Sequence, residues 1–216
     1  QRVASYWQGS GTLAAVADRP GALQCGQPDF PDAAAHCRSF LLDTPWSAAF
    51  ISWVMRQAGI TDFPVSASHI PYVAAAHARP DAGPYRTADP YQSRLRPGDL
   101  VCYLRGREQN LGHAGLMLAL AQGSTAGWTS HCDLVVASNP GGNRTAYAIG
   151  GNVLNTVTLR LLPLDARGAL LPATAADAPC SPGRPAACSF NRQDWSVLLQ
   201  LRAQPPQAVA LPRPTP

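Results

Sequence analysis

The sequence of 216 residues contains no lysine, a single glutamate, Glu108, and few charged residues, which make up 14% of it. Typical soluble domains have roughly 25% charged residues, so this composition excludes a highly charged, solvated or disordered chain. All 17 basic residues are arginines, spread from Arg2 to Arg213 without a basic run that could follow a phosphate backbone. Nucleic acid is therefore not an expected partner. The missing lysine is typical of GC-rich coding and favours a bacterial source.

Long apolar runs are also missing. No segment reaches the roughly 18 consecutive apolar residues that a membrane-spanning helix needs, so we expect no transmembrane segment. Proline is frequent, at 21 of 216 residues, which argues against helical repeats and coiled coils. The length fits a single domain, which we place at residues 1–202. Residues 203–216 are rich in proline and predict an extended, poorly ordered tail.

The six cysteines bear on the compartment. Two pairs have spacings in loop-rich segments that suit local disulfides, namely Cys25 with Cys37 and Cys180 with Cys188. Local disulfides favour an exported protein, periplasmic or secreted, whose signal has been removed; the alternative is six reduced thiols in the cytosol. Cys102 and Cys132 fall in predicted strands, where we expect buried free thiols.

Hydrophobic periodicity predicts helices in the first half of the chain and strands in the second. The helices are expected within residues 2–19, from Thr44 to Gly59, and over 68–78, with a loop over 20–43. The strands are expected at residues 100–104, 131–137, 147–149 and 153–162. Residues 112–121 fit either a strand or a short helix. This order predicts an α+β domain whose helices pack on one face of a small antiparallel sheet.

Ser47 is the first residue with a pattern that indicates chemistry. It falls in the first turn of the helix expected from Thr44, where unpaired backbone amides and the positive end of the helix favour an anion. A nucleophile at this place has its anionic form stabilised. The simpler interpretation is that Ser47 helps Thr44 to cap the helix.

His131 adds a candidate base. It begins a predicted strand, whose alternation places Asp133 on the same face and Cys132 on the other. An imidazole beside a nucleophile at a helix start is the general-base arrangement of acyl-transfer enzymes, in which a third polar group orients the ring. Asn152, which follows two glycines, and Asp133 are the two candidates for that group.

Four segments carry a resemblance to a known family: PWSAAFISWVMRQAGI (45–60), PGDLVCY (97–103), HCDLVV (131–136) and GGNV (150–153). In order, they resemble the nucleophile helix, first core strand, histidine strand and later polar strand of the CHAP and NlpC-type cell-wall hydrolases. The sequence is most similar to an uncharacterised branch with the same SAAFISWVM and IGGNV segments and serine at the nucleophile position. The resemblance covers roughly residues 40 to 170 and implies a papain-like fold.

The resemblance also implies a function. Members of this family are amidases and endopeptidases that act on peptidoglycan, and their catalytic cysteine falls on Ser47. The expected reaction is therefore hydrolysis of an amide bond in peptidoglycan or its stem peptides, with Ser47 as nucleophile and His131 as base. The departure from cysteine matters, because a serine hydroxyl must lose its proton in the attacking step.

Four further residues are candidates for substrate binding. Trp46 would line a sugar or peptide groove, although its spacing also fits the core. His69 and Tyr72 occur in the same branch of the family and would contact substrate or support the site. His113, in the run GHAGLM, is a rival base, because the family's histidine strand can have this pattern. We favour His131, since an apolar strand and the Gly-Gly-Asn segment follow it.

Other chemistries receive little support. The mixed set His113, His131, Cys132 and Asp133 lacks CxxC or HExxH spacing, so no metal is expected, and no cofactor motif is present. Two alternatives to a peptidoglycan hydrolase remain open. One is a non-catalytic binding module of the envelope in which Ser47 marks lost chemistry, and the other is an esterase for small acyl esters.

Overall fold

The computed structural model describes residues 2–27, 29, 31–172, 191 and 193–202. Its helices are α1 (Arg2–Ser10), α2 (Ala22–Gly26), α3 (Ala33–Asp43), α4 (Ser47–Gln57), α5 (Ile70–Ala78) and α6 (Gly112–Ala121). Its strands are β1 (Tyr85–Ala88), β2 (Leu100–Arg105), β3 (Thr129–Ser138), β4 (Thr145–Val153), β5 (Thr156–Pro163) and β6 (Trp195–Leu201). Three short 3₁₀ helices are η1 (Leu13–Val16), η2 (Gly106–Glu108) and η3 (Pro140–Gly142). The mixed α+β class is confirmed.

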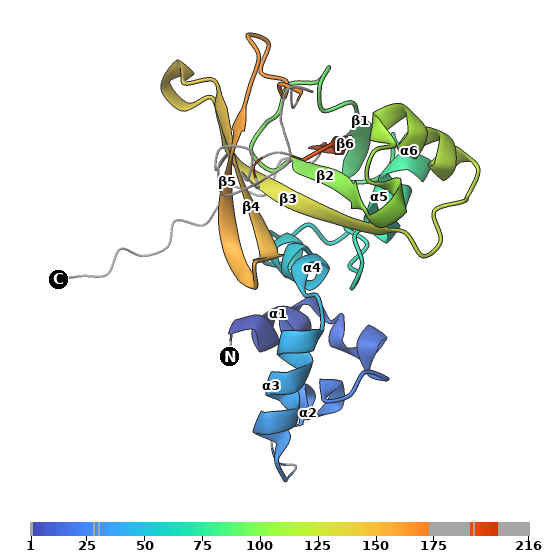
Figure 1. Ribbon diagram of the computed structural model, residues 1–216, viewed down its shortest axis with the longest axis vertical. Helices are drawn as coiled ribbons and strands as arrows, with labels where there is room; N and C mark the ends of the chain where they lie inside the picture. Colours follow the sequence, from blue (N-terminus) through green and yellow to red (C-terminus); the bar gives the residue numbers. More distant parts are fainter. Residues whose placement is uncertain (1, 28, 30, 173–190, 192, 203–216) are drawn as a thin grey trace, which may run out of the picture.

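The strands form one sheet in the order β1-β6-β2-β3-β4-β5, with every neighbouring pair antiparallel, as predicted. Helix α4 packs against β3 and β4, α5 against β1, and α6 against β6, whereas α1 packs on α4. In Figure 1 the helices α1 to α3 lie together beyond α4, away from the sheet. Helix α4 therefore connects the N-terminal helices to the middle of the sheet.

Two apolar cores lie on opposite faces of the sheet. The first is between the sheet and the helices and contains Phe50, Met55 and Val73 together with Cys132 and Val197. The second lies on the other face, where alternate residues of β2 to β6 meet the loop residues Leu95, Leu164 and Leu170. Because successive residues of a strand point to opposite faces, neighbours in one strand belong to different cores.

The cysteine predictions have mixed outcomes. The disulfide Cys25–Cys37 is confirmed and joins α2 to α3. The prediction of free thiols at Cys102 and Cys132 was wrong. These residues are directly opposite each other on β2 and β3, with Cα atoms 4.1 Å apart, and they form a second disulfide. Two disulfides are typical of proteins from oxidising compartments. The predicted pair Cys180–Cys188 and the predicted tail at 203–216 lie outside the described residues.

The start of α4 differs from the prediction. Thr44 precedes Pro45, which disfavours the helical conformation, and Thr44 is extended at φ −106° and ψ 120°. It ends α3 by donating its N–H to the carbonyl of Phe40 instead of capping α4. Helix α4 begins at Ser47, so Ser47 is its first residue. The predicted stop is confirmed, since Gly59 follows the helix with φ +72°.

One other local prediction was wrong, and two strands were missed. The predicted loop at 20–43 contains α2 and α3, and strands β1 and β6 were not predicted. Strand β6 is buried on both faces, so its sequence, WSVLLQL, is almost continuously apolar and lacks the alternation that identifies a half-buried strand. The undecided segment 112–121 is the helix α6.

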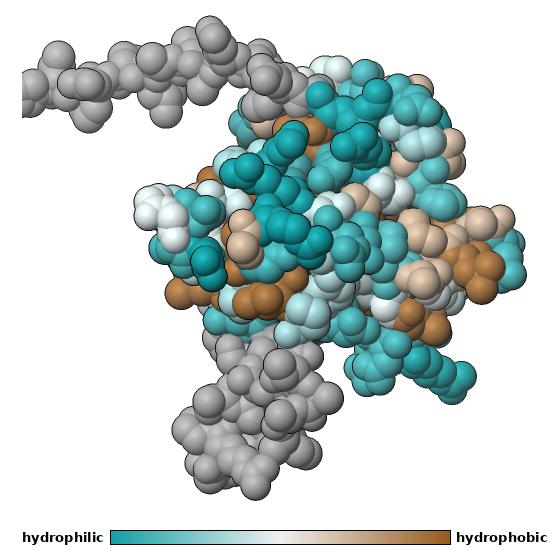
Figure 2. Space-filling view, turned by 90° about the horizontal axis from the view of Figure 1, so that it is seen from above, coloured by the Kyte–Doolittle hydropathy of each residue, from teal (hydrophilic) through white to brown (hydrophobic). Residues whose placement is uncertain are grey.

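The surface view in Figure 2 shows hydrophobic side chains in separate patches on a mainly hydrophilic face. Within the described part of the chain, no helix has both the length and the apolar character that crossing a membrane requires.

Candidate active site

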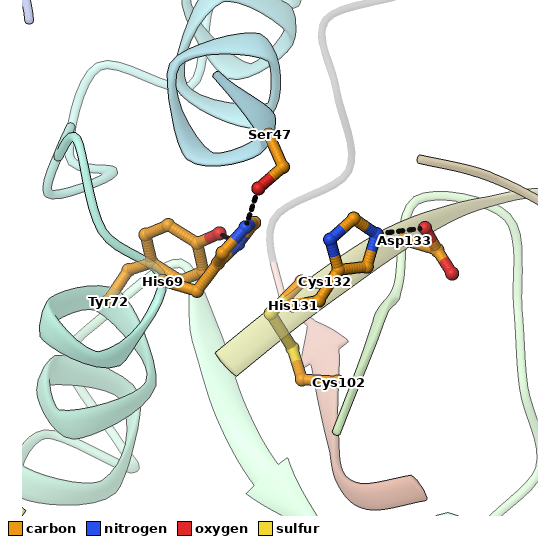
Figure 3. The surroundings of a disulfide bond; sticks show 7 residues. All are labelled: Ser47, His69, Tyr72, Cys102, His131, Cys132 and Asp133. Atoms are coloured by element: carbon orange, nitrogen blue, oxygen red, sulfur yellow. Dashed lines mark hydrogen bonds and ion pairs between the residues drawn. A yellow bond between two sulfur atoms is a disulfide. The ribbon is translucent and has the colours of Figure 1, made fainter. Parts of the chain in front are cut away.

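Ser47 is hydrogen bonded to a histidine from the next helix. Its Oγ lies 2.7 Å from Nε2 of His69, the residue immediately before α5 (Figure 3). Ser47 is 8% exposed and His69 3% exposed, so this contact lies at the inner edge of the surface. The first residue of α4 and the N-cap of α5 thus bring together two groups that are 22 residues apart in the chain.

The second ring nitrogen of His69 is bonded to a tyrosine one helical turn later. Residues three apart share a helix face, and the hydroxyl of Tyr72 meets Nδ1 of His69. Burial lowers the pKa of His69 well below 6.5, and the nearby His131 and Arg105 lower it further. Burial also raises the pKa of Tyr72 well above 10. His69 is therefore a neutral imidazole and Tyr72 a protonated phenol at neutral pH.

A second imidazole belongs to the sheet. Nε2 of His131 lies 2.9 Å from Oδ1 of Asp133, which confirms that strand alternation puts the two side chains on one face of β3. The other carboxylate oxygen, Oδ2, lies 2.8 Å from Nε of Arg160 on β5. Asp133 is fully buried, so the guanidinium and the imidazole together compensate its charge.

The two imidazoles are neighbours. The ring centroids of His69 and His131 are 5.4 Å apart, and the centroid of Tyr103 of β2 is also 5.4 Å from that of His131. Figure 3 shows the His131 ring between the Ser47–His69 pair and Asp133, with its Nδ1 on the side of His69. Ser47 is thus hydrogen bonded to His69 and not to His131, the predicted partner. His131 lies beside this pair.

The two glycines of the Gly-Gly-Asn segment of β4 leave space for the His131–Asp133 pair and for α4. A Cβ atom on Gly150 would lie 1.7 Å from Oδ1 of Asp133 and 2.8 Å from Nε2 of His131. On Gly151 a Cβ atom would lie 2.7 Å from Cβ of Phe50 in α4. Both glycines therefore allow a close approach, the first of the His131–Asp133 pair and the second of the helix that carries Ser47.

Asn152 has a backbone role at this place. Its φ is +60°, in the left-handed region that asparagine tolerates better than most residues, and the register of β4 with β5 shifts between Gly150 and Val153. Of the two candidates for orienting His131, Asp133 makes the hydrogen bond. Among the hydrogen bonds of the described residues, none joins Asn152 to His131.

Two other candidate residues form hydrogen bonds outside the Ser47–His69–His131 cluster. His113 is in α6, not in a strand, and its Nδ1 is bonded to the carbonyl of Ser196 at 2.9 Å. Trp46 is buried, and its Nε1 donates a hydrogen bond to Oδ1 of Asn155 at 3.1 Å. In the described ranges, no three His, Cys, Asp or Glu side chains gather as a metal site would require.

An open groove lies next to Trp46, the residue that precedes Ser47. It has a volume of about 390 Å³ and runs between α1 and the turn that joins β4 to β5. Its lining combines a cation, two aromatic rings and polar groups: Arg2, Val3, Tyr6, Trp46, Asn155, Thr156 and Val157. Such a mixture suits a ligand that is partly apolar and partly charged.

Two features of the site were missed by sequence reasoning. His69 was assigned to substrate contact or support, and its bond to Ser47 was not foreseen; the available signal was a histidine before a helix with a tyrosine three residues later. Arg160 was not considered. Its signal was a single arginine in the otherwise uncharged strand TVTLRLLP, where a buried charge requires a partner.

Comparisons with known proteins place the chain in a family. Neither the curated proteins nor the solved structures contain a match to it. A family profile does match, and it spans residues 1–201, which includes every residue of the site described above. The chain therefore belongs to the bacterial family described as "Uncharacterized protein conserved in bacteria (DUF2272)".

Proposed function

We propose that this protein is an exported serine hydrolase that cleaves an amide bond in a cell-wall peptide. The observation that carries the proposal is the hydroxyl of Ser47, which lies at the start of a buried helix, 2.7 Å from one imidazole and beside a second imidazole that is paired with a carboxylate. A nucleophile, a base and an orienting acid within one small volume are the elements of acyl-transfer catalysis.

His131, the imidazole on strand β3, is the better base. A carboxylate only accepts hydrogen bonds, so Nε2 of His131 carries the proton that Asp133 binds, and Nδ1 keeps its lone pair. When His131 takes a second proton, the carboxylate stabilises the imidazolium. Among the described residues, no carboxylate is bonded to His69, and burial, His131 and Arg105 keep it neutral.

The reaction then balances as follows. Ser47 Oγ attacks the carbonyl carbon, its proton passes to Nδ1 of His131, and a tetrahedral oxyanion forms. The C–N bond breaks, and the amine leaves with the proton from His131. Water attacks the acyl-enzyme and gives a proton to His131, the bond from carbon to Oγ breaks, and Ser47 recovers its proton. Backbone amides in the first turn of α4 are suitable donors to the oxyanion.

The groove beside Trp46 supports a peptide substrate. One of its lining residues, Trp46, directly precedes the nucleophile Ser47 in the chain. The guanidinium of Arg2 offers a partner to a carboxylate of the peptide. The arrangement of a nucleophile helix against an antiparallel sheet that supplies the histidine and its acid also agrees with a papain-like fold. The two disulfides favour the periplasm or the cell exterior as the place of action.

Digestion of purified peptidoglycan tests the proposal. The wild-type chain should release muropeptides with new amino and carboxyl groups, detected by chromatography and mass spectrometry. Ser47→Ala should lower the rate by at least roughly 10³-fold, since the nucleophile is removed. Ser39→Ala, which removes an exposed hydroxyl from α3, is the matched control and should retain full activity.

Three results would overturn the proposal. One is unchanged hydrolysis by Ser47→Ala. The second is an inactive wild-type chain that gains activity as Ser47→Cys, which would identify a binding module with a decayed site. The third is turnover of chromogenic acyl esters without any cleavage of muropeptides, which would identify an esterase.

A further inference from the structure

His69 and Tyr72 have no part in the reaction as written above, although they hold the nucleophile. We propose that Tyr72 fixes His69 as its Nε2–H tautomer, so that His69 donates a hydrogen bond to Ser47 Oγ and stabilises negative charge on that oxygen. The inference rests on the proposed function and assigns a catalytic role to His69 and a positioning role to Tyr72. It divides the work between the two imidazoles, with His131 as base and His69 as donor.

Hydrogen-bond accounting favours this tautomer. The hydroxyl of Tyr72 is buried, and among the described residues its hydrogen-bond partner is Nδ1 of His69. If Nδ1 carried the proton, the phenol would accept that bond, and its own proton would be buried without an acceptor, which costs about 1–3 kcal/mol. If the phenol donates to Nδ1 instead, both polar hydrogens of the pair have a partner. The hydrogen left over is then that of Ser47, which is 8% exposed and can also meet water, whereas Tyr72 is 1% exposed.

The consequence for Ser47 follows from the inventory of a neutral imidazole, which has one N–H donor and one lone-pair acceptor. With Nδ1 accepting from Tyr72, the proton is on Nε2, which lies 2.7 Å from Ser47 Oγ. His69 therefore donates to the serine oxygen. The serine O–H is left to donate elsewhere, and the lone pair of His131 Nδ1 lies on this side of the site (Figure 3).

The groups around His69 keep it neutral. They are Tyr72 on its own helix, Ser47 from α4, His131 from β3 and Arg105 at the end of β2. Burial lowers the pKa of His69 most, and His131 and Arg105 lower it further. None of these groups is an acid that would stabilise an imidazolium on His69. Of the two imidazoles, His131 is the one bonded to a carboxylate, through its Nε2 and Oδ1 of Asp133.

A donor at Oγ assists two steps. During attack it stabilises the charge that develops on Oγ as the proton leaves for His131. During hydrolysis of the acyl-enzyme, Oγ is the leaving group, and the same N–H stabilises the departing alkoxide. This assistance compensates for the weak acidity of a serine hydroxyl, which a cysteine would not require.

Nitrogen-15 NMR of the full chain without substrate tests the tautomer. Long-range 1H–15N correlations distinguish the two neutral forms, with assignment by His69→Gln and His131→Gln variants. We expect His69 as the Nε2–H tautomer at pH 7.5, and a shift toward Nδ1–H in Tyr72→Phe. An Nδ1–H tautomer in the wild type, or an unchanged tautomer in Tyr72→Phe, overturns the inference. This measurement needs no turnover, so its failure is distinct from failure of the proposed function.

Kinetics test the catalytic part. Tyr72→Phe should lower kcat roughly tenfold with KM unchanged, the effect of one neutral hydrogen bond. Tyr147→Phe, at a partly exposed phenol bonded to Asn143, is the control and should match the wild type. An unchanged kcat in Tyr72→Phe, or a loss that appears in KM instead of kcat, contradicts the assignment.

Discussion

The site has two imidazoles with different hydrogen-bond partners: a helix-borne one, His69 at the start of α5, and a sheet-borne one, His131 on β3. His69 is bonded to a phenol and to a serine, both neutral, whereas His131 is bonded to a carboxylate that is itself paired with a guanidinium. Both rings carry their proton on Nε2 in our assignment. The two rings present different atoms to the site: His69 presents its Nε2–H to Ser47, and His131 presents its Nδ1 lone pair.

The difference shows how one side-chain type obtains two roles from its surroundings. Burial next to neutral groups lowers the basicity of an imidazole and suits it to donate a hydrogen bond. A bond from Nε2 to a carboxylate leaves the Nδ1 lone pair of the other imidazole able to accept a proton, as the proposed reaction requires. The two environments also predict different energetic consequences when a partner is removed.

The largest effect is expected on the unfolding free energy when the partner of each imidazole is removed, Asp133 for His131 and Tyr72 for His69. Asp133→Asn leaves the buried guanidinium of Arg160 opposite a neutral amide and should lower the unfolding free energy by about 3–5 kcal/mol. Tyr72→Phe removes one neutral hydrogen bond and should cost about 1–3 kcal/mol. Urea unfolding followed by circular dichroism measures both.

The control for the charged pair is Asp165→Asn, which breaks a more exposed ion pair with Arg167. The amide oxygen of asparagine can still accept the backbone N–H groups of Arg167 and Ala169. We expect no measurable change, because solvent screens exposed ion pairs. If Asp133→Asn lowers the unfolding free energy no more than Tyr72→Phe does, the charged partners of His131 stabilise the fold no more than the neutral partner of His69.

Gly150 tests how closely the sheet-borne half is packed. Gly150→Ala places a methyl group against Asp133 and His131, so it should cost about 1–3 kcal/mol and displace the pair. The φ of Gly150 is not in the left-handed region, so the cost comes from contact and not from backbone strain. Urea unfolding and the His131 imidazole shifts in NMR measure the two effects.

Gly26→Ala in α2 is the matched control. Its methyl group would meet Leu13 Cδ2 at 3.5 Å, an ordinary contact, and alanine favours the helix. Stability should be unchanged or slightly raised. Equal behaviour of the two variants would mean that β4 moves freely enough to accept a side chain beside the His131–Asp133 pair.

The sequence alone predicted the sheet-borne half better than the helix-borne half. Alternation along a strand is a local rule, and it was sufficient to place Asp133 beside His131. The antiparallel sheet also followed from local patterns. Strand β6 did not, because burial on both faces removes the alternation on which recognition of a strand depends.

The bond between Ser47 and His69 depends on how two helix starts meet, and no local rule contains that information. Arg160 reaches Asp133 from β5, and this contact depends on the order of the strands in the sheet. The Gly-Gly-Asn segment was recognised as part of the site but for the wrong reason. Its glycines are required for close approach, whereas the expectation concerned the side chain of Asn152.

The smallest expected effect is in the pH dependence of stability. The pKa of His69 lies well below 6.5 in the folded chain, so below pH 6.5 the unfolded chain binds more protons at this residue. The stabilisation is therefore complete above pH 6.5 and is lost as pH falls toward the folded pKa, by at most about 1.4 kcal/mol per pH unit. Asp99 acts with the opposite sign, because burial raises its pKa to about 6, so its contribution is lost as pH rises through that value.

Comparing wild type with His69→Gln separates these two contributions, since Asp99 is present in both chains. The difference in unfolding free energy, measured by urea unfolding between about pH 5 and pH 8, should be constant above pH 6.5 and shrink below it. A difference that stays constant down to pH 5 would mean that His69 binds a proton equally well in the folded and unfolded chain. His69 would then be as able to carry a proton as a solvated histidine, and the division of labour between the two imidazoles would lose its physical basis.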